Sequence, residues 1–169
     1  MNESFDEQLE ILVEAALKED VGDGDHSTLA CIPADEMGKA VLKIKEAGIL
    51  AGVDVAEKIF KLKYAAVVFN RNMNDGETMK PGDVAFDVEA PVQIILQCER
   101  LVLNCMQRMS GIATLTAKYT EKLKGYHSRI LDTRKTTPNF RVLEKEAVRI
   151  GGGLNHRMGL YDMIMLKDN

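Results

Sequence analysis

The sequence contains no tryptophan, few other aromatic residues, and no apolar run approaching the ~20 residues that a membrane-spanning helix requires. Its first residues, MNESFDEQLE, are acidic, whereas a secretory signal peptide begins with a basic segment followed by an apolar one. A content of 46% hydrophobic and 28% charged residues is ordinary for a folded domain and argues against disorder. We therefore expect a cytoplasmic globular protein that binds no membrane.

Cysteine is also scarce. The three cysteines, Cys31, Cys98 and Cys105, are an odd number and form no CxxC pair, which argues against a disulfide framework or a zinc site. Cys98 and Cys105 are seven positions apart in a predicted helix, so they are separated by roughly 10 Å of helical rise and cannot bond to each other. We expect all three to be small, buried, apolar side chains.

Charge is distributed unevenly along the chain. Residues 1–30 contain nine acidic residues and one lysine, whereas residues 129–169 contain eight Lys and Arg against five Asp and Glu. The basic segment has neither the broad positive face nor the interleaved aromatic residues typical of nucleic-acid binding. It is better suited to a small ligand that carries several negative charges.

The first half of the sequence predicts a small α/β module. Ser4 and Glu7 fit a capping box, and apolar residues then recur at helical spacing over residues 5–19. The following segment EDVGDGDHST lacks the acid spacing of a calcium loop, so we interpret it as a polar turn and not as a metal site. Beyond it, the patterns predict strands at residues 39–45, 65–69 and 84–88 and a helix at residues 53–63.

A long helix is predicted from Pro91 towards Gly125, because proline is favourable at a helix start. Its apolar residues are spaced alternately by three and four, which indicates one continuous packing face. The pattern does not decide whether this helix bends at Ser110–Gly111. The residues of this apolar face are Ile95, Cys98, Val102, Cys105, Met109, Ile112 and Thr116.

After Gly125 the pattern predicts a strand at residues 128–132, a basic turn, a helix over residues 140–150 and a short strand at residues 163–166. A strand–helix–strand unit of this size places its strands parallel and buried on both faces. Because such a sheet cannot consist of two strands, we expect the chain to be part of a longer fold. The run Gly151-Gly152-Gly153 either ends the helix or lets the backbone approach a ligand, and the pattern alone does not decide between these.

The basic residues of this unit are predicted to lie at one end of the sheet. Arg134 and Lys135 follow the first strand, Lys167 follows the second, and the carboxyl ends of parallel strands converge on one face. His156 and Arg157 lie in the loop that precedes the second strand. An arginine fork and several lysine charges suit a ligand with at least two anionic groups. Scattered surface charges are the alternative.

The segment LDTRKTTPNFRVLEKEAVRIGGGLNHRMGLYDMIMLKDN closely resembles the corresponding region of the quinolinate phosphoribosyltransferase family, also called nicotinate-nucleotide pyrophosphorylase (decarboxylating). EDVGDGDHST, AGILAGVDVAEKIF and ERLVLNCMQRMSGIAT resemble the same family, in the same order. The resemblance therefore covers nearly the whole chain.

This resemblance implies an α/β (α+β) fold with an N-terminal α/β sandwich domain at residues 1–112, followed at residues 113–169 by the first βαβ part of an incomplete α/β barrel. It implies a cytosolic, Mg²⁺-dependent pentosyltransferase of NAD biosynthesis. The enzyme would convert quinolinate and phosphoribosyl pyrophosphate to nicotinate mononucleotide, pyrophosphate and CO₂. The resemblance also implies a homodimer or higher homo-oligomer whose active sites are shared between subunits.

Residue by residue, the resemblance implies a basic pocket for the quinolinate carboxylates and a neighbouring turn for the phosphoribosyl group. Arg100 would reach the site across the dimer, and Lys135 and Lys167 would be catalytic. No metal ligand is expected in this chain, because the family's acidic Mg²⁺-binding residues follow later in its sequence. The residues carried over to substrate binding are Arg100, Thr133, Arg134, Lys135, His156, Arg157 and Lys167.

The sequence departs from the family's usual TPG-L-R turn, which reads Thr137-Pro138-Asn139-Phe140-Arg141 here. Asparagine also tolerates the left-handed conformation, so we expect a modest local change. Two alternatives stay open: a related phosphoribosyltransferase for another pyridine or heterocyclic acid, and a non-catalytic association or anion-binding fragment. We expect this chain on its own to be inactive.

Overall fold

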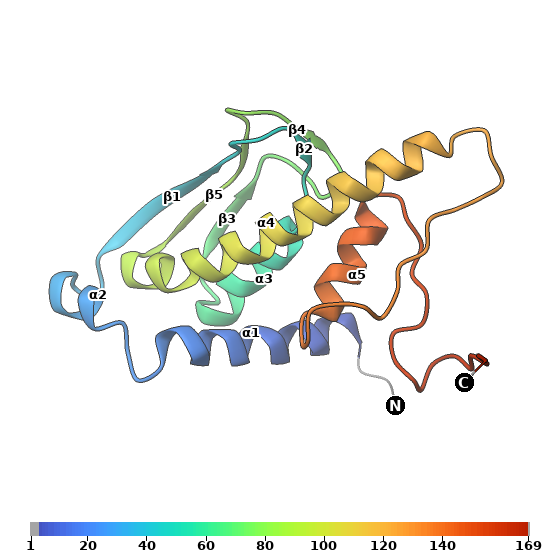
Figure 1. The fold of residues 1–169 in the computed structure, drawn as a ribbon. Helices are drawn as coiled ribbons and strands as arrows, with labels where there is room; N and C mark the ends of the chain where they lie inside the picture. Colours follow the sequence, from blue (N-terminus) through green and yellow to red (C-terminus); the bar gives the residue numbers. More distant parts are fainter. Residues whose placement is uncertain (1–3, 169) are drawn as a thin grey trace.

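The structure is a computed structural model that describes residues 4–168 (Figure 1). A long central helix, α4, lies between a small antiparallel sheet on one side and the helices α1 and α5 on the other. The elements in chain order are α1 (Phe5–Val21), α2 (His26–Cys31), β1 (Met37–Lys43), β2 (Gly48–Ile49), α3 (Val53–Lys63), β3 (Val68–Arg71), β4 (Thr78–Met79), β5 (Val84–Pro91), α4 (Val92–Lys122) and α5 (Arg141–Ile150).

The larger sheet has the strand order β1-β5-β3 and is antiparallel throughout, while β2 and β4 form a separate two-stranded pair. Exposed and half-buried residues alternate along β1, as expected for a sheet with one face in solvent. On the buried side, the ring of Phe69 on β3 lies 4.4 Å from that of Phe86 on β5 and 6.3 Å from that of Phe60 on α3, centroid to centroid. The aromatic contacts therefore join α3 to the sheet.

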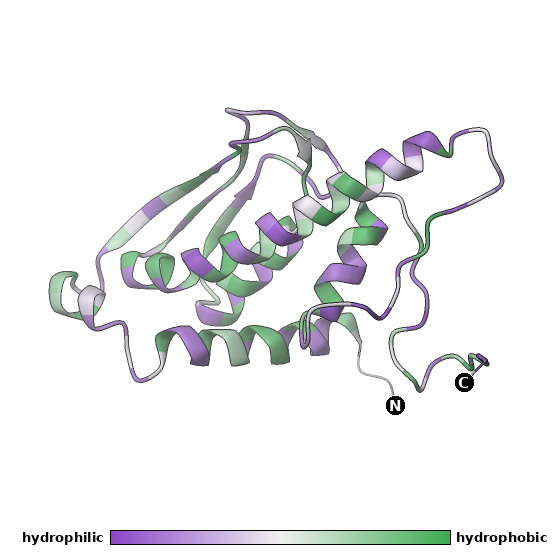
Figure 2. Ribbon diagram, viewed as in Figure 1, coloured by the Kyte–Doolittle hydropathy of each residue, from purple (hydrophilic) through white to green (hydrophobic). Residues whose placement is uncertain are grey.

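The predicted N-terminal helix is confirmed as α1, including its cap. The Ser4 hydroxyl accepts a hydrogen bond from the Glu7 amide at 3.3 Å, and the Glu7 carboxylate accepts one from the Ser4 amide at 2.7 Å. Leu9 and Val13 on its inner face are fully buried in the core. Figure 2 shows the resulting mixture of hydrophobic and hydrophilic residues along this helix.

The predicted long helix is confirmed as α4, which continues without a break through Ser110 and Gly111. Its apolar face forms the centre of the core, with Cys98, Cys105 and Met109 fully buried. The expectation that all three cysteines are buried is wrong for Cys31, which is exposed at the end of the short helix α2. Among residues 4–168, no helix is long and apolar enough to cross a membrane.

Two strands predicted for the second half of the chain are absent from the described residues. Residues 128–132 and 163–166 form no strand, and only an isolated parallel bridge joins Leu131 to Leu154. Ile164 and Leu166 are 92% and 93% exposed. A strand depends on hydrogen bonds to a neighbour, and residues 4–168 contain no sheet that these segments join. The predicted helix between them is confirmed as α5.

Smaller elements also differ from the sequence patterns. The segment interpreted as a polar turn leads into α2, which begins at His26 and is capped by the Asp25 carboxylate. The strand predicted at residues 65–69 lies at Val68–Arg71, and the short pair β2–β4 was not predicted. The fold is therefore the expected mixed α/β module at its N-terminal end, joined through α4 to α5 and an irregular C-terminal segment.

The glycine run after α5 permits close helix packing. A Cβ atom on Gly151 would lie 2.5 Å from the carbonyl oxygen of Ala113 on α4, and one on Gly153 would lie 2.7 Å from a methyl group of Val148. Both contacts are shorter than real Cβ atoms show. The run thus ends α5 and allows the chain to pass against α4.

Candidate anion-binding site

Five of the six predicted basic site residues converge on one pocket of about 410 Å³ beside α5. Two irregular segments form it, one running from Asp132 to Lys135 and the other from His156 to Lys167. The expectation that Arg134, Lys135 and Lys167 share a pocket is therefore confirmed. The residues that line it are Asp132, Thr133, Arg134, Lys135, His156, Arg157, Met165 and Lys167.

Arg100 does not belong to this pocket. It lies exposed on α4, in the turn that follows the buried Cys98, and does not line the pocket within this chain. Its expected contribution to the site of a second subunit stays a prediction.

Arg134 has an unusual environment within the pocket. Its Nε atom is buried and has no hydrogen-bond partner among residues 4–168. A buried donor without an acceptor is unfavourable, and guanidinium groups bind carboxylates and phosphates through two parallel hydrogen bonds. An anionic ligand in the pocket would supply the acceptor that Arg134 lacks.

Glu144 on α5 holds the chain at Thr137, just beyond the first pocket segment. Its carboxylate accepts hydrogen bonds from the Thr137 hydroxyl at 2.8 Å, from the Thr137 amide at 3.2 Å and from the Arg108 guanidinium at 2.7 and 3.0 Å. Burial of this carboxyl raises its pKa, but the hydrogen bonds from Arg108 and Thr137 outweigh burial, so the net pKa is lowered. The ionised carboxylate thus ties the segment to both α4 and α5.

Lys145, the next residue of α5, holds the near end of the same segment. It forms a buried ion pair with Asp132, with side-chain exposures of 4% and 5%. Asp132 also accepts hydrogen bonds from the Asn155 side chain at 2.6 Å and from the His156 amide at 2.8 Å. Two consecutive helical residues of opposite charge therefore hold the segment that carries Thr133, Arg134 and Lys135.

The sequence patterns did not identify Arg108, Glu144, Lys145 or Asn155 as part of the site. No local signal marks them, because Glu144 and Lys145 have the pattern of surface charges on an amphipathic helix and their partners Arg108 and Asp132 are distant in the sequence. The departure from the family's usual turn at Asn139 agrees with the expectation from the sequence. Asn139 has φ 60°, the left-handed conformation that we expected asparagine to tolerate.

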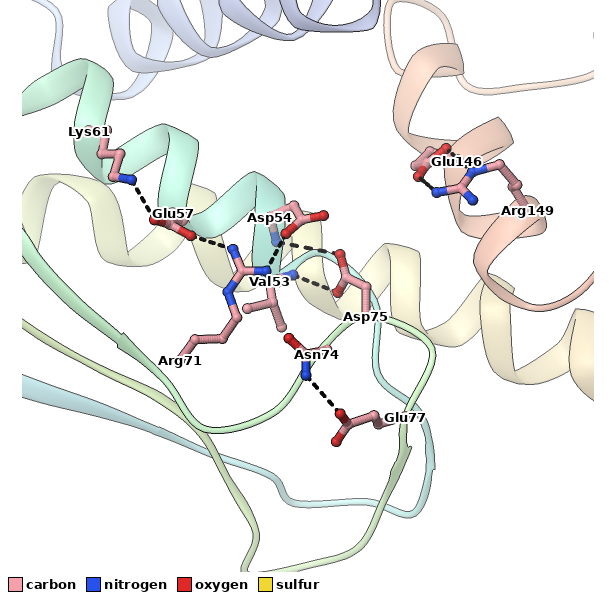
Figure 3. A network of polar contacts seen from close by, with 10 residues as sticks. All are labelled: Val53, Asp54, Glu57, Lys61, Arg71, Asn74, Asp75, Glu77, Glu146 and Arg149. Carbon is pink, nitrogen blue, oxygen red and sulfur yellow. Dashed lines mark hydrogen bonds and ion pairs between the residues drawn. The ribbon is translucent and has the colours of Figure 1, made fainter.

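A second group of charges lies on α3 and is satisfied within itself (Figure 3). Gly52 offers no side chain to cap α3, and the Asp75 carboxylate takes this role by accepting hydrogen bonds from the Val53 amide at 2.8 Å and the Asp54 amide at 3.4 Å. Arg71 pairs with Asp54 at 2.6 Å and also with Glu57. Arg71 is therefore paired with two carboxylates.

The described residues supply no metal centre. Among residues 4–168, no group of three or more His, Cys, Asp and Glu side chains could hold a metal ion. Asp132, a carboxylate of the pocket, is engaged by Lys145, Asn155 and His156. The residues present therefore do not fit a magnesium site.

The fold and the pocket define a mixed α/β protein with a cationic site suited to a small, multiply charged anion. Comparison with known families identifies it further. The sequence model described as "Quinolinate phosphoribosyl transferase, N-terminal domain" matches residues 25–110, and the model of the C-terminal domain matches residues 112–169. The chain belongs to the quinolinate phosphoribosyltransferase family.

Individual relatives agree with this assignment. The chain is 45% identical to quinolinate phosphoribosyltransferase [decarboxylating] 1b of Nicotiana tabacum over 94% of this chain and 45% of the relative. It is 43% identical to a probable nicotinate-nucleotide pyrophosphorylase [carboxylating] of Bacillus subtilis, over 96% of this chain and 56% of the relative. The crystal structure of NadC from Streptococcus pyogenes is similar with a TM-score of 0.89 and 45% identity, over 95% of this chain and 58% of that one. The chain thus spans about half the length of the curated relatives it matches.

Proposed function

We propose that the protein takes part in transfer of the phosphoribosyl group of phosphoribosyl pyrophosphate to quinolinate, with decarboxylation to nicotinate mononucleotide. The observation that carries this proposal is the convergence of Arg134, Lys135, His156, Arg157 and Lys167 on one pocket in a chain of this family. A dicarboxylate and a pyrophosphate-bearing sugar together require this density of cationic groups.

In the proposed reaction the quinolinate nitrogen forms a bond to the anomeric carbon of the sugar, and the carbon–oxygen bond to pyrophosphate breaks with its electron pair. The bond to the 2-carboxylate then breaks and CO₂ leaves. The electron pair remaining on the ring carbon is stabilised by the positive ring nitrogen until a proton is added. This scheme requires no covalent nucleophile from the protein.

The pocket residues would contribute by position and by charge. Arg134, His156, Arg157 and Lys167 would hold the two carboxylates, which aligns the ring nitrogen with the sugar and raises the effective concentration of the reactants. Lys135, on the turn for the phosphoribosyl group, would stabilise the charge that develops on the departing pyrophosphate. Thr133 accepts a hydrogen bond from the Lys135 amide at 3.1 Å and would fix the turn that presents this lysine.

Several expectations remain part of the proposal. We propose a homodimer or higher homo-oligomer in which Arg100 enters the site of a second subunit, and a cytoplasmic location. The resemblance also implies a dependence on magnesium. The described residues do not fit a magnesium site, so this dependence is a proposal about the family fold and not about residues 4–168. No step above depends on it.

A complementation assay tests the proposal. A full-length family enzyme lacking the arginine that corresponds to Arg100 is mixed with this chain, and nicotinate mononucleotide formed from quinolinate or from nicotinate is measured. We expect activity to return with quinolinate. Arg100→Ala in this chain should abolish the recovery, while Arg129→Ala, an exposed arginine outside the pocket, should leave it intact.

Two results of this assay would favour the alternatives. Equal or better use of nicotinate would contradict quinolinate as the substrate and would indicate a related phosphoribosyltransferase. Absence of recovery, together with retained binding of quinolinate, would contradict the shared site and indicate an anion-binding fragment without catalysis.

A further inference from the structure

The two segments that form the pocket begin side by side as a very short parallel pair. The Leu154 amide donates a hydrogen bond to the Ile130 carbonyl at 2.9 Å, and the Asp132 amide donates to the Leu154 carbonyl at 3.1 Å. In a regular parallel ladder the next hydrogen bond would join the amide of residue 156 to the backbone carbonyl of residue 132.

That next hydrogen bond is made by a side chain instead. The His156 amide donates to the Asp132 carboxylate at 2.8 Å. The carboxylate thus replaces the carbonyl in the ladder, so the backbone after Asp132 turns away from the strand direction while remaining bonded to the second segment. This turn carries Arg134 and Lys135 to the pocket that His156 and Arg157 also line.

Asn155 fixes the orientation of this carboxylate. Its side-chain amide donates to Asp132 at 2.6 Å and to the backbone carbonyl of Lys145 on α5 at 2.7 Å. Lys145 itself pairs with the other carboxylate oxygen. The first segment, the second segment and α5 therefore meet at one carboxylate, and the asparagine residue is exposed and does not line the pocket.

We infer that Asp132 and Asn155 are positioning residues, which set the distance and orientation between the Arg134–Lys135 turn and the His156–Arg157 turn. Neither is assigned a contact with substrate. A ligand that binds both turns at once depends on their relative placement, and small displacements of binding groups weaken such binding strongly. The inference rests on the proposed function, since the ligand used to test it is quinolinate.

Asn155→Ala is the appropriate variant, because it removes both hydrogen bonds from an exposed position. Its matched control is Asn70→Ala, which removes a similar amide hydrogen bond, of 2.7 Å, from the exposed Asn70 on β3 to the half-buried Asp87 on β5. Two readouts are measured for each variant: the amide NMR resonances of residues 133–135 and 156–157 without ligand, and the dissociation constant for quinolinate by calorimetry. Thermal melting confirms that each variant is folded.

We expect Asn155→Ala to melt close to the wild-type temperature, to shift resonances in both turns, and to bind quinolinate roughly tenfold more weakly. Asn70→Ala should change neither readout. Shifts confined to the neighbours of residue 155, or unchanged quinolinate affinity, would overturn the inference. If the wild-type protein binds no quinolinate, the proposed function fails, and the resonances of the two turns still decide whether Asn155 positions them.

Discussion

Lys145 forms an ion pair with Asp132 of the cationic pocket in which each side chain is about 95% buried, with exposures of 4% and 5%. Removing one partner of such a pair leaves an unpaired charge in the interior. Lys145→Met should therefore lower the free energy of unfolding by about 3–5 kcal/mol. Urea denaturation monitored by circular dichroism measures this loss.

The double variant Asp132→Asn/Lys145→Met provides the control. It leaves no buried charge, and the asparagine oxygen can still accept the hydrogen bond from the His156 amide. The double variant should be more stable than the sum of the two single changes predicts, because the two residues interact directly. Additive losses would contradict a coupled pair.

Two glycines near α4 should respond oppositely to alanine. Gly151→Ala places a Cβ atom 2.5 Å from the Ala113 carbonyl oxygen, so backbone must move, and we expect a loss of about 1–3 kcal/mol. Gly111 lies exposed within α4 with no neighbouring atom in the way, and Gly111→Ala should stabilise the protein by about 0.5–1 kcal/mol. Thermal and urea denaturation of both variants test these two expectations. Equal effects of the two substitutions would contradict the close contact at Gly151.

The stability of the protein should fall in acid partly through Glu144. Because its folded pKa lies below its usual 4.5, its contribution to stability is complete above that pH and is lost as the pH falls through the lowered value. Glu144→Gln should therefore reduce stability at neutral pH and flatten the loss of stability below about pH 4.5. An unchanged acid slope, measured by urea denaturation from pH 3 to 7, would contradict this role.

Asp75 should have the opposite effect on stability as the pH falls. Burial raises the pKa of its carboxyl above the usual 3.8, so protonation favours the folded state as the pH falls through the raised value. Asp75→Asn removes this compensation, and the acid loss of stability should become steeper. A flatter profile for this variant would show that burial is not the dominant influence on Asp75.

The three thiols should differ in reactivity. Cys31 is exposed, while burial raises the pKa of Cys98 to about 11 and that of Cys105 to about 12. Only the thiolate is nucleophilic. A chromogenic disulfide reagent should therefore modify one thiol quickly in the folded protein and all three in denaturant, and Cys31→Ser should remove the fast phase. Two fast thiols would contradict the buried environment of the α4 cysteines.

The parts of the fold that were predictable from the sequence are those determined by local pattern. Apolar spacing along α1 and α4 indicated both helices and their buried faces, and the Ser4–Glu7 cap indicated where α1 begins. The short helix α2 was not predicted, because six residues carry too little periodicity. The strands expected at residues 128–132 and 163–166 do not form, because a strand depends on neighbours that local pattern cannot supply.

The pocket likewise contains residues that were predictable from the sequence and residues that were not. The cationic residues were predictable because they lie in polar segments where charges are unconstrained by packing, and the family resemblance specified them. The residues that hold them in place were not, because Glu144 and Lys145 look like ordinary surface charges on an amphipathic helix. Their burial becomes evident only when Asp132, Asn155 and Arg108 are seen to converge on them from distant parts of the chain.

Whether the pocket binds a dicarboxylate is tested most directly by calorimetric titration of this chain with quinolinate and, separately, with nicotinate. We expect that quinolinate binds, that nicotinate, which lacks one carboxylate, binds at least roughly tenfold more weakly, and that Arg134→Met abolishes the difference. Equal affinity for the two acids, or no binding of quinolinate, would contradict a pocket built for a dicarboxylate.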